Sequence, residues 1–106
     1  MITADSINEI FATYRKYGWV PRRLLLTTAT MHLGNVEPEI PAMVSNIDAA
    51  WFSRPPANGE IAWEIRYLGN TPFALLENLD ETDAEFEQKL KNIEMRLKAS
   101  VSAKRN

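Results

Sequence analysis

Apolar residues recur at helical spacing in two long segments, one near each end of the chain. The first stripe consists of Ile7, Ile10, Phe11, Tyr14 and Tyr17, and the second of Phe86, Leu90, Ile93 and Leu97. Gly18 follows the first stripe as a residue that commonly ends a helix in the left-handed conformation. Thr82 and Glu85 have the spacing of a capping box before the second. We therefore predict helices over 5–17 and 82–99.

Apolar and polar residues alternate strictly over 61–68, which predicts a strand. Its apolar face carries Ile61, Trp63, Ile65 and Tyr67. Its other face carries the charged residues Glu64 and Arg66. A turn sequence follows, and Pro72 can begin a strand but not continue one. We expect 72–77 to pair with the first strand as an antiparallel hairpin.

The middle of the chain is divided into shorter segments. The leucine run within 22–28 is short and follows a proline, which favours a buried strand over a helix. The segment 40–44 is compatible with a short edge strand. Ser45 and Asp48 stand at capping positions, so we predict a short helix over 46–53.

These elements together predict an α+β fold with a small, mainly antiparallel sheet of three or more strands. The two long amphipathic helices could cover one face of this sheet. A break is expected at 55–59, where two prolines are followed by Ala, Asn and Gly. The chain of 106 residues has the usual size of one domain, so we expect a single domain over 1–106 whose end frays from about 100 to 106.

Composition and charge narrow the function classes. The chain is 45% hydrophobic and 25% charged, which is typical of a soluble globular protein. A formal net charge of −2 does not favour binding to nucleic acid or to anionic lipid. No apolar run has the length of a membrane span, and the first residues do not resemble a secretory signal. The chain has no cysteine, which excludes cysteine nucleophiles and thiolate metal sites and fits a cytoplasmic location.

Candidate catalytic and metal-binding residues are sparse. His32 is the single histidine, and it has no nucleophile-elbow motif near it, so we interpret it as a loop or turn residue. The acidic groups at 37–39 and 80–83 lack the spacing of a calcium loop and are explained by solvation and helix-terminus electrostatics. The four glycines stand apart and form no phosphate-binding motif. We therefore expect no metal and no cofactor.

Two groups of residues are candidates for binding. The corner 51–54 holds Trp51 and Phe52, which cannot share one narrow helical stripe, followed by Arg54. Exposure of one aromatic beside an arginine would make this corner a contact surface; alternatively, Trp51 lies in the core and Phe52 packs on the hairpin. Glu64 and Arg66 could hold a substrate carboxylate or phosphate, or could simply form a polar sheet face.

Two basic pairs, Arg15–Lys16 and Arg22–Arg23, lie close together in sequence with aromatic residues between them. This mixture could contact nucleic acid. Alternatively, the first pair complements the negative end of a helix dipole and the second solubilises an edge strand. The balanced net charge favours the alternative.

We interpret the chain as a non-enzymatic binding or protein-interaction module that self-associates as a homodimer. The expected binding residues are Trp51, Phe52, Arg54, Glu64 and Arg66. The homodimer is expected because the chain has three Trp, three Tyr and four Phe, more aromatic surface than one sheet face can cover. The alternative is a small enzyme or ligand-binding domain that uses Glu64, Arg66 and His32 at a cleft on a sheet face.

Overall fold

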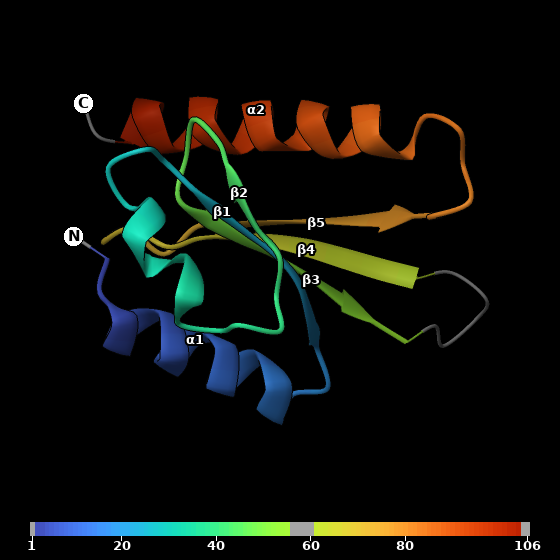
Figure 1. Ribbon diagram of the computed structural model, residues 1–106. Helices are drawn as coiled ribbons and strands as arrows, with labels where there is room; N and C mark the ends of the chain where they lie inside the picture. Colours follow the sequence, from blue (N-terminus) through green and yellow to red (C-terminus); the bar gives the residue numbers. More distant parts are fainter. Residues whose placement is uncertain (1, 56–60, 105–106) are drawn as a thin grey trace.

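The computed structural model describes residues 2–55 and 61–104, and over these residues five strands form one mixed sheet with helices on both sides (Figure 1). The helices are α1 (Ala4–Lys16), the short 3-10 helix η1 (Met31–Asn35) and α2 (Phe86–Lys104). The strands are β1 (Val20–Leu26), β2 (Ala42–Val44), β3 (Ala49–Arg54), β4 (Ile61–Tyr67) and β5 (Ala74–Leu79). The predicted α+β class is confirmed.

The sheet has the strand order β2-β1-β3-β4-β5. The predicted strands at 22–28, 61–68 and 72–77 correspond to β1, β4 and β5, with ends shifted by one or two residues. The hairpin of β4 and β5 is confirmed as antiparallel, and the edge strand suggested at 40–44 is β2. β2 pairs with β1 in parallel, whereas all other neighbours are antiparallel.

The segment 46–53 is not helical, so the short helix predicted there is wrong. From Ala49 the chain forms the central strand β3, whose successive side chains point to opposite faces of the sheet. Both faces are covered at this strand, so the apolar run from Ala49 to Phe52 is buried on both sides. Asp48 does not cap a helix; its carboxylate accepts hydrogen bonds from the Thr27 N–H and the Thr30 hydroxyl.

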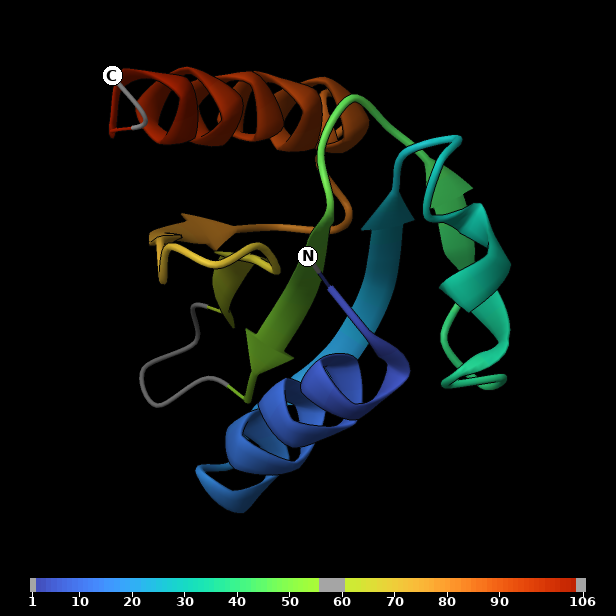
Figure 2. The ribbon, with the colours of Figure 1, turned by 90° about the vertical axis from the view of Figure 1, so that its left-hand side faces the viewer.

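The two long helices lie on opposite faces of the sheet, not on one face as the sequence suggested (Figure 2). On one face, α2 packs its apolar stripe against Trp51, Trp63 and Ile65. On the other, α1 packs against Phe52 and Leu24. The sheet therefore separates two hydrophobic clusters, and each helix covers the side chains that β3 sends to its face.

The ends of the helices differ in part from the sequence prediction. Thr3 and Ser6 form a capping box at the start of α1, and Gly18 has a φ of 87°, which confirms its predicted left-handed conformation. The capping box predicted at Thr82 is wrong, because aspartate side chains at 80 and 83 accept from backbone N–H groups in turns, and α2 begins only at Phe86.

The last helix extends further along the chain than the predicted bound of residue 99. α2 continues to Lys104, and Val101 is buried against the core, so the helix extends past residue 100, where the tail was expected to begin. Apart from Pro55, the break predicted at 55–59 lies outside the described residues, as do the last two residues of the tail. No helix in the described part of the chain is both long and apolar enough to cross a bilayer.

Candidate functional site

A bulge in β1 turns two consecutive arginines toward α2. The register between β1 and β3 shifts between Pro21 and Arg23, so Arg22 is an extra residue in the strand. Arg22 donates to the Ser53 hydroxyl at 3.0 Å, and its guanidinium lies 4.6 Å from the centre of the Trp63 ring. Pro21 lacks an N–H group and is accommodated at this irregularity.

The arginines connect the sheet to the segment that leads into α2. Arg22 pairs with Glu81 at 2.7 Å, and Arg23 donates to both carboxylate oxygens of Glu87 at 2.9 and 2.6 Å. The hydrogen bonds from Arg23 lower the pKa of the Glu87 carboxyl. Arg22 and Arg23 precede the part of β1 that pairs with β2, which begins at Leu24, and both side chains have carboxylate partners in place of solvent alone.

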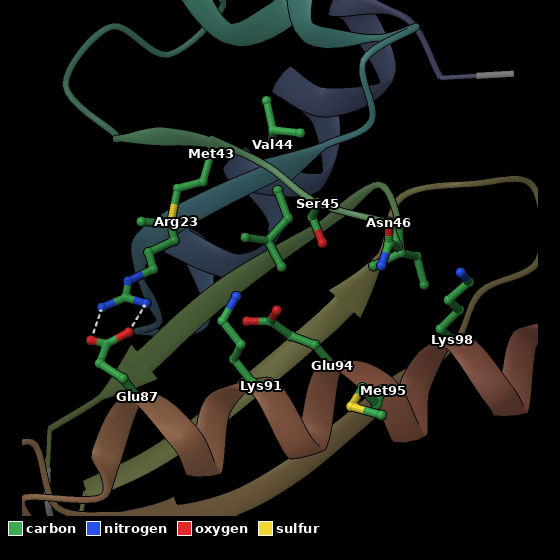
Figure 3. A pocket seen from close by; sticks show the side chains of 12 residues that line it. Arg23, Met43, Val44, Ser45, Asn46, Glu87, Lys91, Glu94, Met95 and Lys98 are labelled. Carbon is green, nitrogen blue, oxygen red and sulfur yellow. Dashed lines mark hydrogen bonds and ion pairs between the residues drawn. The ribbon is translucent and has the colours of Figure 1, made fainter.

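A cleft of about 380 Å³ lies between α2 and the β1–β2 side of the sheet (Figure 3). It exists because α2 covers β4 and β5, while the face of β1 and β2 beside it is not covered by a helix in the described structure. Leu25 and Ile47 are buried residues in its lining. Met43, Val44 and Met95 are apolar side chains exposed at the same cleft.

The cleft carries charge on its helical side. Glu87, Lys91, Glu94 and Lys98 line it from α2, and Figure 3 shows Lys91, Glu94 and Lys98 projecting toward the strands. Both carboxylates have donors, because Glu87 is paired with Arg23 and Glu94 accepts from the Trp51 indole at 3.0 Å. Lys91 and Lys98 make no ion pair within the described residues. The cleft thus combines apolar walls with two available cations.

Trp51 and Phe52 have no exposed surface, so the expectation of an exposed aromatic at this corner is wrong. Trp51 faces α2, where its ring meets the Trp63 ring edge-on at 6.2 Å. Phe52 faces α1, where it stacks on Tyr14 at 3.9 Å between ring centres. The alternative placement of Trp51 in the core agrees with the structure, and Phe52 packs on α1 beside its cross-strand neighbour Glu64, which lies on β4 of the hairpin. Neither side chain offers a contact surface in this fold.

Arg54 is the one member of the predicted corner that is exposed. Its guanidinium lies 5.4 Å from the centre of the Trp19 ring, a cation–π geometry at the end of β3. This contact joins β3 to the connection between α1 and β1.

Glu64 and Arg66 lie on the face of β4 that looks toward α1, and both are half-buried. The Tyr14 hydroxyl donates a hydrogen bond to Glu64, and Arg66 donates to the Tyr67 carbonyl. Burial raises the pKa of the Tyr14 phenol, and the hydrogen bond to Glu64 raises it further. Glu64 therefore has a structural partner that the sequence analysis did not identify.

The residues of the alternative reading do not meet at the cleft. Its lining contains neither Glu64 nor Arg66, and His32 lies exposed on η1. Within the described residues, no cluster of three or more acidic residues or histidines is arranged to hold a metal ion.

The residues that line the cleft from α2 were not predicted from the sequence. One signal was available: Glu87, Lys91, Glu94 and Lys98 follow one another at helical spacing directly beside the predicted apolar stripe. Such a charged row usually faces solvent, and the sequence does not show that a sheet lies opposite it. Comparison of the chain with models of known protein families, with curated proteins and with solved structures gave no match.

Proposed function

We propose that this protein is a non-enzymatic protein-interaction module that holds an extended, acidic peptide segment in the cleft between β2 and α2. The observation that carries the proposal is that Lys91 and Lys98, which form no ion pair with the residues that the structure describes, lie beside the apolar side chains of a cleft that opens along an edge strand. The cleft volume falls within the range of ligand-binding pockets.

The charges favour an anionic occupant. Arg23 and Glu87 neutralise each other, whereas Glu94 keeps its negative charge because the Trp51 indole that donates to it is neutral. With Lys91 and Lys98 against Glu94, the lining still carries an excess of positive charge. The ammonium groups of Lys91 and Lys98 remain to attract carboxylates. Met43 and Met95 add flexible apolar surface that adapts to different side chains.

The strand edge favours an extended peptide over a compact small molecule. Pro41 and Ser45 direct their backbone hydrogen bonds toward β1. By the alternation of a strand, the N–H and C=O of Val44 point away from the sheet. A peptide laid along β2 would pair with these groups and place alternate side chains in the cleft. A cytoplasmic location forms part of the proposal, because a chain without cysteine requires no oxidising compartment.

The test is an NMR titration of the full chain with a short peptide in which glutamate alternates with valine. We expect amide shifts in β2 and in the cleft-facing turns of α2. Lys91→Glu should weaken binding by about tenfold or more, since it replaces an attracting charge with a repelling one. Lys16→Glu is the matched control: it makes the same charge change on α1, across the sheet from the cleft, and should leave binding nearly unchanged.

Two further probes decide between occupants. The same peptide with lysine in place of glutamate should not bind. If it binds equally well, or if Lys16→Glu weakens binding as much as Lys91→Glu does, the charge argument fails. Binding of decanoate at the cleft without binding of the peptide would assign the site to a small amphiphile and overturn the peptide proposal.

A further inference from the structure

The opposite edge of the sheet is formed by β5, which pairs with a strand on one side only among the described residues. β5 is the last strand in the sheet order, and its six residues pair with β4 without any shift of register. The Tyr67 N–H donates to the Phe73 carbonyl. This bond shows that Phe73 directs its backbone groups toward β4, and every second residue after it does the same. Residues 73, 75 and 77 therefore direct their backbone groups toward β4, whereas the N–H and C=O of Leu76 point away from the sheet.

This edge has few of the features that usually prevent strands from pairing, and its one charged residue is Glu77. Soluble proteins protect exposed edges with proline, lysine, bulges or very short strands. The segment Ala74–Leu79 contains neither proline nor lysine and is regular. Leu76, at its centre, is 60% exposed, although its neighbour across the hairpin is the half-buried Glu64.

The edge is complementary to itself. Antiparallel pairing of two β5 strands about Leu76 would exchange two backbone hydrogen bonds between Leu76 and its copy and bring the two leucine side chains together. Glu77 and Arg96 form a loose pair of 3.7 Å beside this strand. A two-fold contact would place one Glu77 and one Arg96 from each copy near the interface. Their charges cancel, so these residues add no net charge to the interface.

We infer that two copies of the chain associate through β5, joining their sheets into one continuous antiparallel sheet with a two-fold axis at Leu76. The α2 helices of the two copies then lie on the same face of the joined sheet. This surface is at the opposite edge from the cleft, so the inference does not depend on the proposed function. An edge-to-edge contact is smaller than a standard interface, so the dimer should dissociate in roughly the micromolar range.

The test is sedimentation equilibrium of the full chain over a concentration series. The mass should rise from 12.1 kDa toward twice that value as concentration increases. Leu76→Lys should keep the protein monomeric, because it places two ammonium groups at the axis. Val44→Lys is the matched control: Val44 is equally exposed at 62%, but it lies on β2, and the dimer should persist.

A second variant tests the backbone pairing itself. Leu76→Pro removes an N–H that is not used in the β4–β5 ladder, so the monomer should still fold, as its circular dichroism spectrum would show. It should abolish association as completely as Leu76→Lys. A monomer at high concentration, or a dimer that survives both Leu76 variants, would overturn the inference; so would a dimer lost equally in Val44→Lys.

Discussion

Trp51 and Trp63 allow the energetic effect of one hydrogen bond to be isolated in the core. The two residues lie on the neighbouring strands β3 and β4, on the same face, and are 0% and 1% exposed. Their indole N–H groups differ. That of Trp51 donates to Glu94 at 3.0 Å, whereas that of Trp63 is buried with no hydrogen-bond partner among the described residues.

Replacing each tryptophan by phenylalanine should therefore have unequal effects. Replacing the indole by the smaller phenyl ring should lower the free energy of unfolding of both variants by a similar amount, about 1–2 kcal/mol, because apolar contact area is lost and a cavity is left. Trp51→Phe also removes a hydrogen bond to a carboxylate, which contributes about 1.5–3 kcal/mol. Trp63→Phe removes a buried donor that lacks an acceptor, and this recovers about 1–3 kcal/mol. A small loss of attraction to Arg22 offsets part of the recovery.

Trp51→Phe should thus lower the free energy of unfolding by about 2–5 kcal/mol more than Trp63→Phe does. The measurement is urea unfolding followed by far-ultraviolet circular dichroism at one fixed protein concentration, because fluorescence would change with the tryptophan content and association would change with concentration. Met95→Ala, at an exposed position of α2, is the control and should have little effect. Equal losses in the two variants, or a larger loss for Trp63→Phe, would refute the argument.

Two further predictions concern polar contacts that hold the sheet. Asp48→Ala should lower the unfolding free energy by about 1–3 kcal/mol, because the Thr27 N–H and the Thr30 hydroxyl lose their acceptor; Asp48→Asn keeps an acceptor and should cost less in the same urea assay. The lowered pKa of Glu87 predicts a stabilisation that is present above the ordinary value of about 4.3 and is lost as pH falls through the folded-state pKa. Glu87→Gln should therefore reduce stability at neutral pH, by less than about 1 kcal/mol for so exposed a pair, but not at pH values near 3. A deficit of equal size at both pH values would contradict this assignment.

Local patterns in the sequence predict those helices and strands that have one apolar face and one polar face. The stripe of α2 and the alternation of β4 have a single apolar side, so their periods of 3.6 and 2 are visible in the residues themselves. Gly18 was equally predictable, because its left-handed conformation is a local property of the backbone. The α+β class follows from these elements.

β3 could not be identified in this way, because it is covered on both faces. Its run of Ala49, Ala50, Trp51 and Phe52 has no period, and a capping pattern at residues 45–48 suggested a helix. Only the tertiary structure shows that the Asp48 carboxylate accepts hydrogen bonds from Thr27 and Thr30. The rings of Trp51 and Phe52 are both buried because α2 and α1 cover opposite faces of the sheet.

The candidate site was decided by the tertiary structure alone. In the sequence, Lys91 and Lys98 belong to a charged row of the predicted helix that would ordinarily face solvent. They face a cleft because α2 lies over β4 and β5 and leaves β1 and β2 uncovered beside it. The exposed edge at Leu76 likewise depends on the order of the strands. The sequence determines which side chains each element presents, since periodicity is local; which of those surfaces remain uncovered depends on long-range packing, which no local pattern records.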